Sequence, residues 1–467
     1  MLGCAAEHRL WGVRQGRPSV AILLAALPGR TRFEPRRGTL AIPTRSIPAH
    51  PQEKRVSTPV FVGSGFVAKY LEGGGNFWVP LQYVFGLRAC GVTAYWLELL
   101  PGTGDPVSDH DRIAKFFTRV RRLGLGDCAA VLYMPEGRES GSRELRCPPG
   151  ISPGELSVGM RDGVLLNLSN SIPGQCRGDF ALKVLYDIDP GMLQLWATQW
   201  DMGVGSHDLY FTIGQSIGAP ECPVPTLGVK WHPVWPVIHL PEWPRQRAEA
   251  ERYTTITQWW NGNNGYDVIG GELYEHNKRT AFLEFVELPR LSGMEFELAA
   301  NVTPGEVEDR ALLAHNGWRL VQPHDVAGTP WSYRRYVQHS RGEFSCAKPS
   351  VVKTTPGWIS DRTLSYLASG RPCVVQAAGA ERHLPRSLGL QFFTTKSEAV
   401  EALRSVERDY PQACREARRL AEEFFATEAV LPRVLQLIGA QRQRPSYARW
   451  SSAMGGERRR TGANPFG

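Results

Sequence analysis

The fold of this chain is decided by residues 356–376, which read PGWISDRTLSYLASGRPCVVQ. The stretch predicts a glycine-containing loop, a short helix capped by Ser360 and Asp361, a glycine stop, and a buried strand that begins at Cys373. A loop that opens into a helix start beside a parallel strand leaves free backbone N–H groups, and the helix dipole adds positive potential. We therefore expect an anion such as a phosphate to bind there, with Arg362 supplying a charged fork.

This segment resembles the donor-binding element of GT-B glycosyltransferases of the "group 1" type, bacterial enzymes similar to families 1 and 4. In those proteins a small-Gly-x-Pro-Val-Val block follows a short helix, and residues 369–375 here read SGRPCVV. The resemblance implies a nucleotide-sugar donor at this helix. Many members that retain the sugar's configuration carry a Glu where Ser365 stands, so their common ribose contact is not implied for this chain.

The length and the charge distribution indicate two domains with basic tails. A chain of 467 residues suits two domains of about 200 residues each. Residues 1–57 hold ten Lys/Arg and three Asp/Glu, and residues 441–467 hold six Arg and one Glu, so the net charge of +8 belongs to the tails. We expect disordered segments at 1–57 and 441–467. Nucleic acid is not an expected partner, whereas peripheral contact of the tails with an anionic membrane stays open.

The cysteines indicate a reducing compartment. There are nine, an odd number, without a C-x-x-C pair, which argues against a disulfide framework and against a zinc site. No apolar run reaches the roughly 18 residues that a membrane-spanning helix needs. The apolar run at 20–27 has no small-x-small cleavage site after it, so we do not interpret it as a signal peptide. The sequence therefore predicts a cytoplasmic protein.

The order of expected elements predicts an α/β fold. A strand at 60–62, a helix through 78–87 and a strand at 92–97 form a βαβ unit, which favours a parallel sheet covered by helices. A Pro/Trp-rich stretch ends at residue 244, and a charged segment follows it. We predict two Rossmann-like domains facing a central cleft: 58–244 for the acceptor, a linker at 245–252, and 253–440 for the donor. The resemblance also implies that the last helix crosses back onto the first domain.

Residues 60–68, VFVGSGFVA, fit the G-x-G-x-x-A fingerprint of dinucleotide-binding proteins. This favours an alternative function, an NAD-dependent oxidoreductase that depends on Gly63 and Gly65. The fingerprint requires an uninterrupted helix after its second glycine, and the triple glycine Gly73, Gly74 and Gly75 interrupts any such helix. In GT-B proteins a glycine-rich loop at this place faces the cleft, so the resemblance implies an acceptor near Gly73–Gly75.

The donor site is expected at the carboxyl end of the second sheet, where open α/β sheets bind ligands. Basic side chains could neutralise a diphosphate there without a metal ion, and no other cofactor is expected. Gln376 ends a strand and is a candidate hydrogen-bond partner of the donor sugar. The expected donor-binding residues are Lys348, Gly357, Ser360, Asp361, Arg362 and Gln376.

Two residues of the first domain are candidates for catalysis. Asp189, in an Asp-x-Asp at a strand end, could act as general base on the acceptor hydroxyl or orient the acceptor, although a structural Asp-Pro-Gly turn explains it equally well. His207, beside Asp208, is the second candidate. The predicted function is metal-independent transfer of a sugar from a nucleotide-diphosphate donor to an unknown acceptor. A catalytically inactive nucleotide-binding protein of the same fold is the main alternative.

Overall fold

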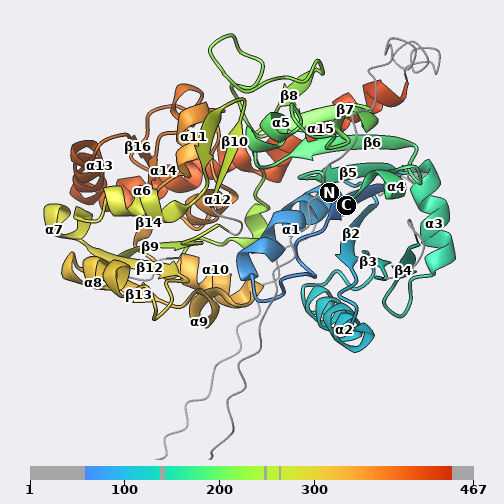
Figure 1. The fold of residues 1–467 in the computed structure, drawn as a ribbon, viewed down its shortest axis with the longest axis horizontal. Coiled ribbons are helices and arrows are strands. Elements are labelled where there is room, and N and C mark those ends of the chain that lie inside the picture. The colour runs from blue at the N-terminus through green and yellow to red at the C-terminus, as the bar shows by residue number, and fades with distance from the viewer. Residues whose placement is uncertain (1–57, 137–141, 247–249, 262–264, 444–467) are drawn as a thin grey trace, which may run out of the picture. The chain divides into compact units, whose positions relative to one another are not determined.

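Two parallel sheets with helices on their faces form the described part of the chain (Figure 1). The computed structural model describes residues 58–136, 142–246, 250–261 and 265–443, all within the unit Val56–Gly467. Residues 1–57 and 444–467, expected as tails, lie outside the described residues. We call residues 58–244 the first lobe and residues 250–425 the second lobe.

The first lobe contains an eight-stranded sheet in the order β4-β3-β2-β1-β5-β6-β7-β8. All neighbours pair in parallel except β3 and β4. Its central strands are buried, as expected for a sheet covered on both faces. The strands are β1 (Val60–Ser64), β2 (Ala94–Pro101), β3 (Ala129–Met134), β4 (Glu144–Arg146), β5 (Val164–Leu168), β6 (Leu182–Asp187), β7 (Leu209–Thr212) and β8 (Trp231–Pro233).

The second lobe contains a six-stranded, wholly parallel sheet in the order β13-β12-β9-β14-β15-β16, and a separate hairpin, β10-β11. The two sheets lie on either side of the expected linker. These strands are β9 (Arg252–Thr257), β10 (Tyr266–Ile269), β11 (Glu272–Glu275), β12 (Glu295–Ala300), β13 (Trp318–Val321), β14 (Gly342–Ser345), β15 (Cys373–Gln376) and β16 (Leu390–Phe393).

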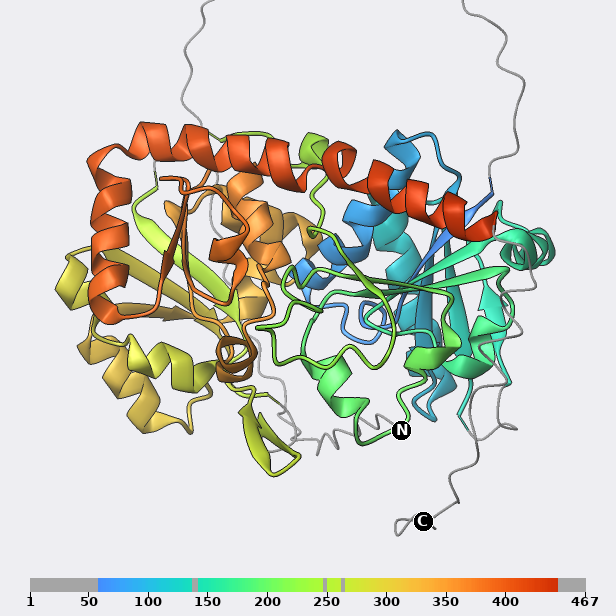
Figure 2. The same ribbon diagram turned by 90° about the horizontal axis from the view of Figure 1, so that it is seen from above.

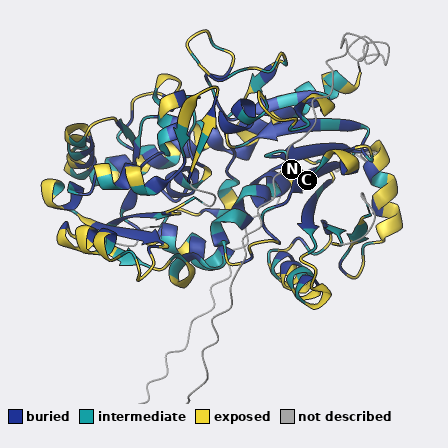
Figure 3. Cartoon of the chain, in the orientation of Figure 1, coloured by how far each residue is buried: buried dark blue, intermediate teal, exposed yellow. Residues whose placement is uncertain are grey.

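The helices pack on both sheets and leave their outer faces exposed (Figure 3). In the first lobe they are α1 (Gly74–Ala89), α2 (Pro106–Arg122), α3 (Pro153–Asp162), α4 (Gly174–Arg177) and α5 (Met192–Trp196). The later helices are α6 (Lys278–Glu284), α7 (Leu288–Ser292), α8 (Val307–His315), α9 (Pro323–Ala327), α10 (Pro330–Gln338), α11 (Pro349–Thr354), α12 (Asp361–Ala368), α13 (Lys396–Arg408), α14 (Tyr410–Leu420), a π-helical turn (Ala421–Phe425) and α15 (Thr427–Arg442).

This topology confirms the predicted fold class, two Rossmann-like α/β sheets. The expected strand, helix and strand at 60–62, 78–87 and 92–97 correspond to β1, α1 and β2. The strand β5, a wholly buried VLLNL run, and the β10-β11 hairpin were not predicted from the sequence. No helix in the described ranges is long and apolar enough to cross a membrane.

The last helix leaves the second lobe and packs on the first, as the resemblance implied (Figure 2). The N–H of Ile238 donates to the carbonyl of Phe425 (2.8 Å), and the N–H of Thr427 donates to the carbonyl of Ile238 (3.1 Å). Near the end of α15, the amide of Gln441 donates to the carbonyl of Asp208 (3.1 Å). By packing, α15 therefore belongs to the first lobe, although it falls within the range 253–440 predicted for the donor domain.

Candidate functional site

The stretch 356–376 folds as a loop, a helix and a strand, as predicted. Ser360 is the N-cap of α12, and its hydroxyl accepts the N–H of Arg362 (3.3 Å). The helix stops at Gly370, whose φ of 73° suits a residue without a Cβ. The strand β15 then enters the sheet between β14 and β16.

Gly357 brings this loop into contact with the first lobe. Its φ is 79°, and a Cβ placed on it would lie 2.7 Å from the backbone nitrogen of Ser216. Its carbonyl accepts the N–H of Gln215 (3.2 Å), and its own N–H donates to the carbonyl of Ala378 (3.1 Å). The N–H group of Gly357, which was expected to be free, is therefore engaged within the second lobe, and its carbonyl is engaged by the first lobe.

Arg362 differs from the expectation that its fork faces an anionic ligand. Its Nε donates to the wholly buried carboxylate of Glu343 (2.6 Å), which lies on β14. Its other nitrogens donate to the carbonyl of Ile256 (2.8 Å) and to the hydroxyl of Ser345 (2.5 Å). Burial alone would lower the pKa of Arg362, but the ion pair with Glu343 raises it. The guanidinium thus links α12 to the sheet. It adds positive charge near the candidate site, but its N–H groups are directed at the protein rather than at a ligand.

Lys278, at the start of α6, is a site residue that the sequence did not reveal. Only 6% of it is exposed, and its ammonium group donates to the carbonyl of Cys346. Within the described ranges no carboxylate forms an ion pair with it. Burial, followed by the charge of Arg362 and more weakly that of Lys348, lowers the pKa of Lys278 to about 7. No motif marks this lysine, since its burial arises only when α6 packs beneath the end of β14.

Lys348 and Asp189, predicted separately, come together across the lobes. The ammonium of Lys348 lies 3.8 Å from the carboxylate of Asp189, which is 56% exposed. The turn that carries Asp189 is held by buried Asp187, whose carboxylate accepts from Gln194 (2.7 Å) and Thr212 (2.9 Å). Burial raises the pKa of Asp187 to about 6. The first Asp of the Asp-x-Asp therefore builds the turn, and the second faces the other lobe.

A hydrogen-bonded chain flanks this pair. The indole N–H of Trp196 on α5 donates to Asp267 (2.7 Å), and the same carboxylate oxygen lies 3.0 Å from His276 Nε2. Nδ1 of His276 lies 3.0 Å from the hydroxyl of Ser350. Burial lowers the pKa of His276, and the ion pair with Asp267 opposes this shift. The β10-β11 hairpin thereby connects the second lobe to α5.

Ser360 and Gln376 also come together, around a cavity of about 20 Å³ that is further lined by Ser345 and Trp358. The side-chain carbonyl of Gln376 accepts the N–H of Ala347 (3.0 Å). A cavity of this size holds one water molecule and is too small for a nucleotide.

Asp361 borders a second small cavity, of about 30 Å³, which it shares with Ser365 and with Tyr83 of α1. Burial raises the pKa of the Asp361 carboxyl, and the charge of Arg362 opposes this rise. This carboxylate therefore lies at the junction of α12 with the first lobe, where the predicted cleft would open.

His207 lies elsewhere. It is 6% exposed, and its Nε2 accepts from Asn167 (3.0 Å) while its Nδ1 lies 3.1 Å from the carbonyl of Val204. Burial, and after it the charge of Arg177, lowers the pKa of His207 to about 4. Its hydrogen-bond partners among the described residues, Asn167, Arg177 and Val204, all belong to the first lobe. The structure therefore separates His207 from Asp189 and Lys348 and indicates a structural role.

Gly73, Gly74 and Gly75 do not form an open loop. Gly73 is the N-cap of α1, and the helix begins at Gly74. A Cβ on Gly74 would lie 2.2 Å from the backbone oxygen of Thr329, and one on Gly75 would lie 2.9 Å from the ring of Tyr333. The glycines thus allow α1 to approach the second lobe closely, which leaves no room here for the acceptor that the resemblance implied.

The loop after β1 does not have the geometry of a dinucleotide site. The buried carboxylate of Glu98 accepts the N–H groups of Val67 (2.7 Å) and Ala68 (2.9 Å), as well as the hydroxyl of Ser64. These are the donors that a cofactor phosphate would need, and the next helix begins only at Gly74. The NAD-dependent alternative therefore loses its support.

Comparison with known proteins gives matches in structure only. The chain matches no protein-family model and no curated protein. Anabaena HepE in complex with UDP and glucose has a TM-score of 0.48 at 8% identity, covering 82% of this chain and 100% of that chain. A glycosyltransferase from Rickettsia africae has a TM-score of 0.47 at 8% identity, covering 83% and 100%. Sucrose-phosphate synthase from Thermosynechococcus elongatus has a TM-score of 0.45 at 11% identity, covering 85% and 100%.

Proposed function

We propose that this protein transfers a sugar from a nucleotide-diphosphate donor to an acceptor hydroxyl, with the diphosphate bound between Lys278 and Lys348. One observation carries the proposal: Lys278 is a buried ammonium that, in the described part of the chain, has no carboxylate partner. A buried charge is costly unless an opposite charge compensates it. The phosphates of the donor would supply that charge.

The neighbouring groups fit this role. Lys348 and the start of α12 add positive potential at the carboxyl end of the sheet, and Arg362 is held behind them by Glu343. In the reaction, the acceptor oxygen bonds to the anomeric carbon and the bond from that carbon to the diphosphate breaks, with its electron pair leaving on the diphosphate. Lys278 and Lys348 stabilise that developing charge, and Asp189 takes the acceptor proton.

The two lysines make a metal ion unnecessary in the proposal, so a chelator is expected to leave turnover unchanged. Among the described residues no group of three or more His, Cys, Asp or Glu is arranged to hold a metal ion.

A catalytically inactive nucleotide-binding protein is the second candidate. It is favoured by the engagement of Gly357 N–H and Arg362 within the chain and by the cavity of about 20 Å³ beside Ser360. Both candidates require the same anion site, and they differ only in turnover.

Calorimetric titration with UDP, GDP and dTDP tests the anion site. The variants Lys278→Met and Lys348→Met are expected to weaken binding at least tenfold, because each removes a charge that faces the diphosphate. The control is Lys353→Met, since Lys353 is 41% exposed and pairs with Glu272 (2.6 Å). Unchanged affinity in Lys278→Met for every nucleotide that binds the natural protein would refute the proposal.

Turnover then separates the two candidates. Incubation with the corresponding nucleotide sugars is expected to release the nucleoside diphosphate slowly, with water as acceptor, and Asp189→Asn is expected to slow that release at least tenfold while donor affinity stays the same. Binding without turnover of any donor would favour the inactive protein.

A further inference from the structure

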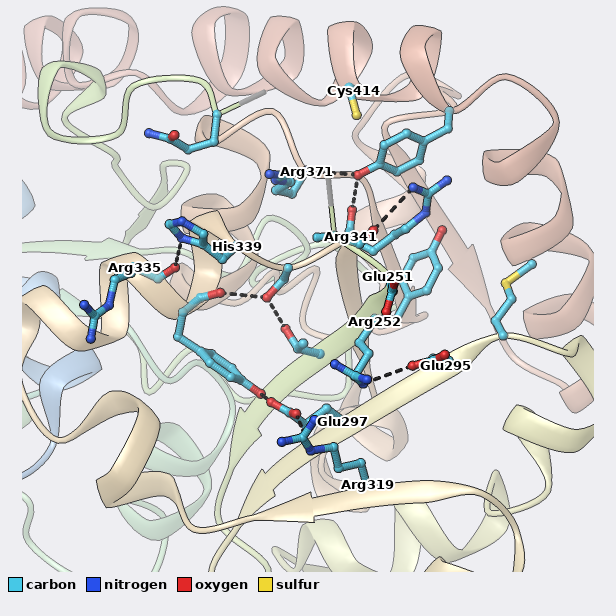
Figure 4. A pocket seen from close by; sticks show the side chains of 18 of the residues that line it. Glu251, Arg252, Glu295, Glu297, Arg319, Arg335, His339, Arg341, Arg371 and Cys414 are labelled. Carbon is cyan, nitrogen blue, oxygen red and sulfur yellow. Dashed lines mark hydrogen bonds and ion pairs between the residues drawn. The ribbon is translucent and has the colours of Figure 1, made fainter. Parts of the chain in front are cut away.

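A pocket of about 1410 Å³ lies at the amino ends of the second sheet, where β9 and β12 begin (Figure 4). In a parallel sheet the amino and carboxyl ends of the strands are opposite edges, so this pocket is distinct from the Lys278 site. One wall is formed by α10 and another by the start of α14. Residues 245–246 and 250–251, which connect the two lobes, complete the lining.

Arginines dominate the charge of this pocket. Among the described residues, seven arginines and five carboxylates line it. Three of the carboxylates are already neutralised by arginines of the same pocket. These pairs are Arg252–Glu295 (3.0 Å), Arg319–Glu297 (3.1 Å) and Arg341–Glu407 (2.5 Å). These three ion pairs thus neutralise three of the five carboxylates, and four of the seven arginines take no part in them.

Arg245 and Arg335 are two cations of the pocket that have no compensating carboxylate among the described residues. Both are exposed, and the guanidinium of neither forms a hydrogen bond or ion pair with the rest of the described chain. In Figure 4 the guanidinium of Arg335 lies apart from the labelled carboxylates. A third cation, Arg415, donates to the side-chain oxygen of Gln412 (2.7 and 2.9 Å) and forms no ion pair with a carboxylate in the described part of the chain.

The chemistry of these groups suits phosphate. A guanidinium presents a planar fork of donors that matches two phosphate oxygens. The eleven-residue helix α14 starts at the pocket with Tyr410 and Pro411, but its N-terminus is capped by Asp409, whose carboxylate accepts the N–H of Gln412 (3.1 Å), so the positive charge for a ligand comes from the arginines. The pocket is also large enough for a small organic ligand, which typically occupies about 300–1,000 Å³.

We propose that this pocket binds a phosphorylated small molecule through Arg245 and Arg335. Because Arg245 belongs to the connecting segment and Arg335 to α10, the ligand would bridge the two. The connecting segment already contacts the second lobe here: the amide of Gln338 donates to the carbonyl of Pro244 (3.2 Å), and Gln246 N–H donates to the carbonyl of Ser369 (3.3 Å). Ligand binding is therefore expected to raise the melting temperature of the full chain.

Titration of the full chain with pyrophosphate tests this proposal in the Lys278→Met background, where binding at the Lys278 site is weakened. Residual pyrophosphate binding is expected there, and adding Arg245→Gln and Arg335→Gln is expected to weaken it at least tenfold. The matched control adds Arg161→Gln and Arg433→Gln, which remove two exposed arginines of the first lobe and α15.

Either of two results would overturn the second site: no residual pyrophosphate binding in Lys278→Met, or equal residual affinity in the pocket variant and the control. Neither result depends on whether nucleotides bind at Lys278. UDP titration of Arg245→Gln/Arg335→Gln keeps the two proposals apart, since the nucleotide affinity of that variant is expected to stay within about twofold of the natural protein.

Discussion

At the scale of the residue, the protonation state of Lys278 affects both the free energy of unfolding and the affinity for an anionic ligand. Its pKa falls from 10.5 to about 7 because the folded chain buries it. Between about pH 7 and 10.5 the unfolded chain therefore holds this proton and the folded chain does not, so the free energy of unfolding rises with pH in this window. Below pH 7 both states are charged and the full cost of burial remains. Lys278→Met is expected to raise the melting temperature at pH 6 and to flatten its rise above pH 7, measured by calorimetry.

The same proton governs the affinity for an anion. A diphosphate binds the charged lysine better, so the Kd for a nucleoside diphosphate is expected to rise by up to about tenfold per pH unit above pH 7, with uptake of one proton. Titrations in two buffers of different ionisation enthalpy would measure that uptake. The exposed Lys353→Met control is expected to keep the slope, and a pH-independent Kd between 7 and 9 would contradict this assignment.

At the scale of the element, the start of α1 requires glycine because the helix packs there directly against the backbone of the second lobe. A Cβ on Gly74 would lie 2.2 Å from the backbone oxygen of Thr329, and that backbone cannot move aside cheaply. Gly74→Ala is expected to lower the free energy of unfolding by about 1–3 kcal/mol through overpacking. Gly159→Ala, in α3, meets nothing closer than 3.8 Å and is expected to stabilise by about 0.5–1 kcal/mol. Chemical denaturation measures both, and equal effects would contradict the packing argument.

At the scale of the whole molecule, α15 joins the chain's end to the first lobe. Leu431 is fully buried against α1, where a Cβ on Gly86 would lie 2.7 Å from it. Leu431→Ala is expected to cost about 2–5 kcal/mol of stability. The exposed Gln436→Ala on the same helix is expected to change stability by less than about 0.5 kcal/mol. Thermal unfolding compares the two, and a neutral Leu431→Ala would show that α15 does not stabilise the first lobe.

The sequence predicted those parts of the site that depend on local chemistry. Ser360 caps α12 and Gly370 ends it because both effects act within a few residues along the chain. The engagement of Arg362 could not be predicted, since its partner Glu343 looks like any other strand residue until β14 pairs with β15. For the same reason the sequence revealed no contact partner for Asp189, the first candidate, or for His207, the second, and only the contact between the lobes brings Asp189 to Lys348.

By itself, the sequence determined the alternation of strands and helices, the two parallel sheets, and the loop, cap and strand of residues 356–376, because periodicity, caps and turns are short-range properties. The tertiary structure alone decided which charges are compensated. Lys278 lies buried without a carboxylate partner among the described residues, Arg362 is paired inside, and Glu98 fills the loop after β1. Burial and pairing depend on contacts between residues far apart in the chain, and these contacts set the charge available to a ligand.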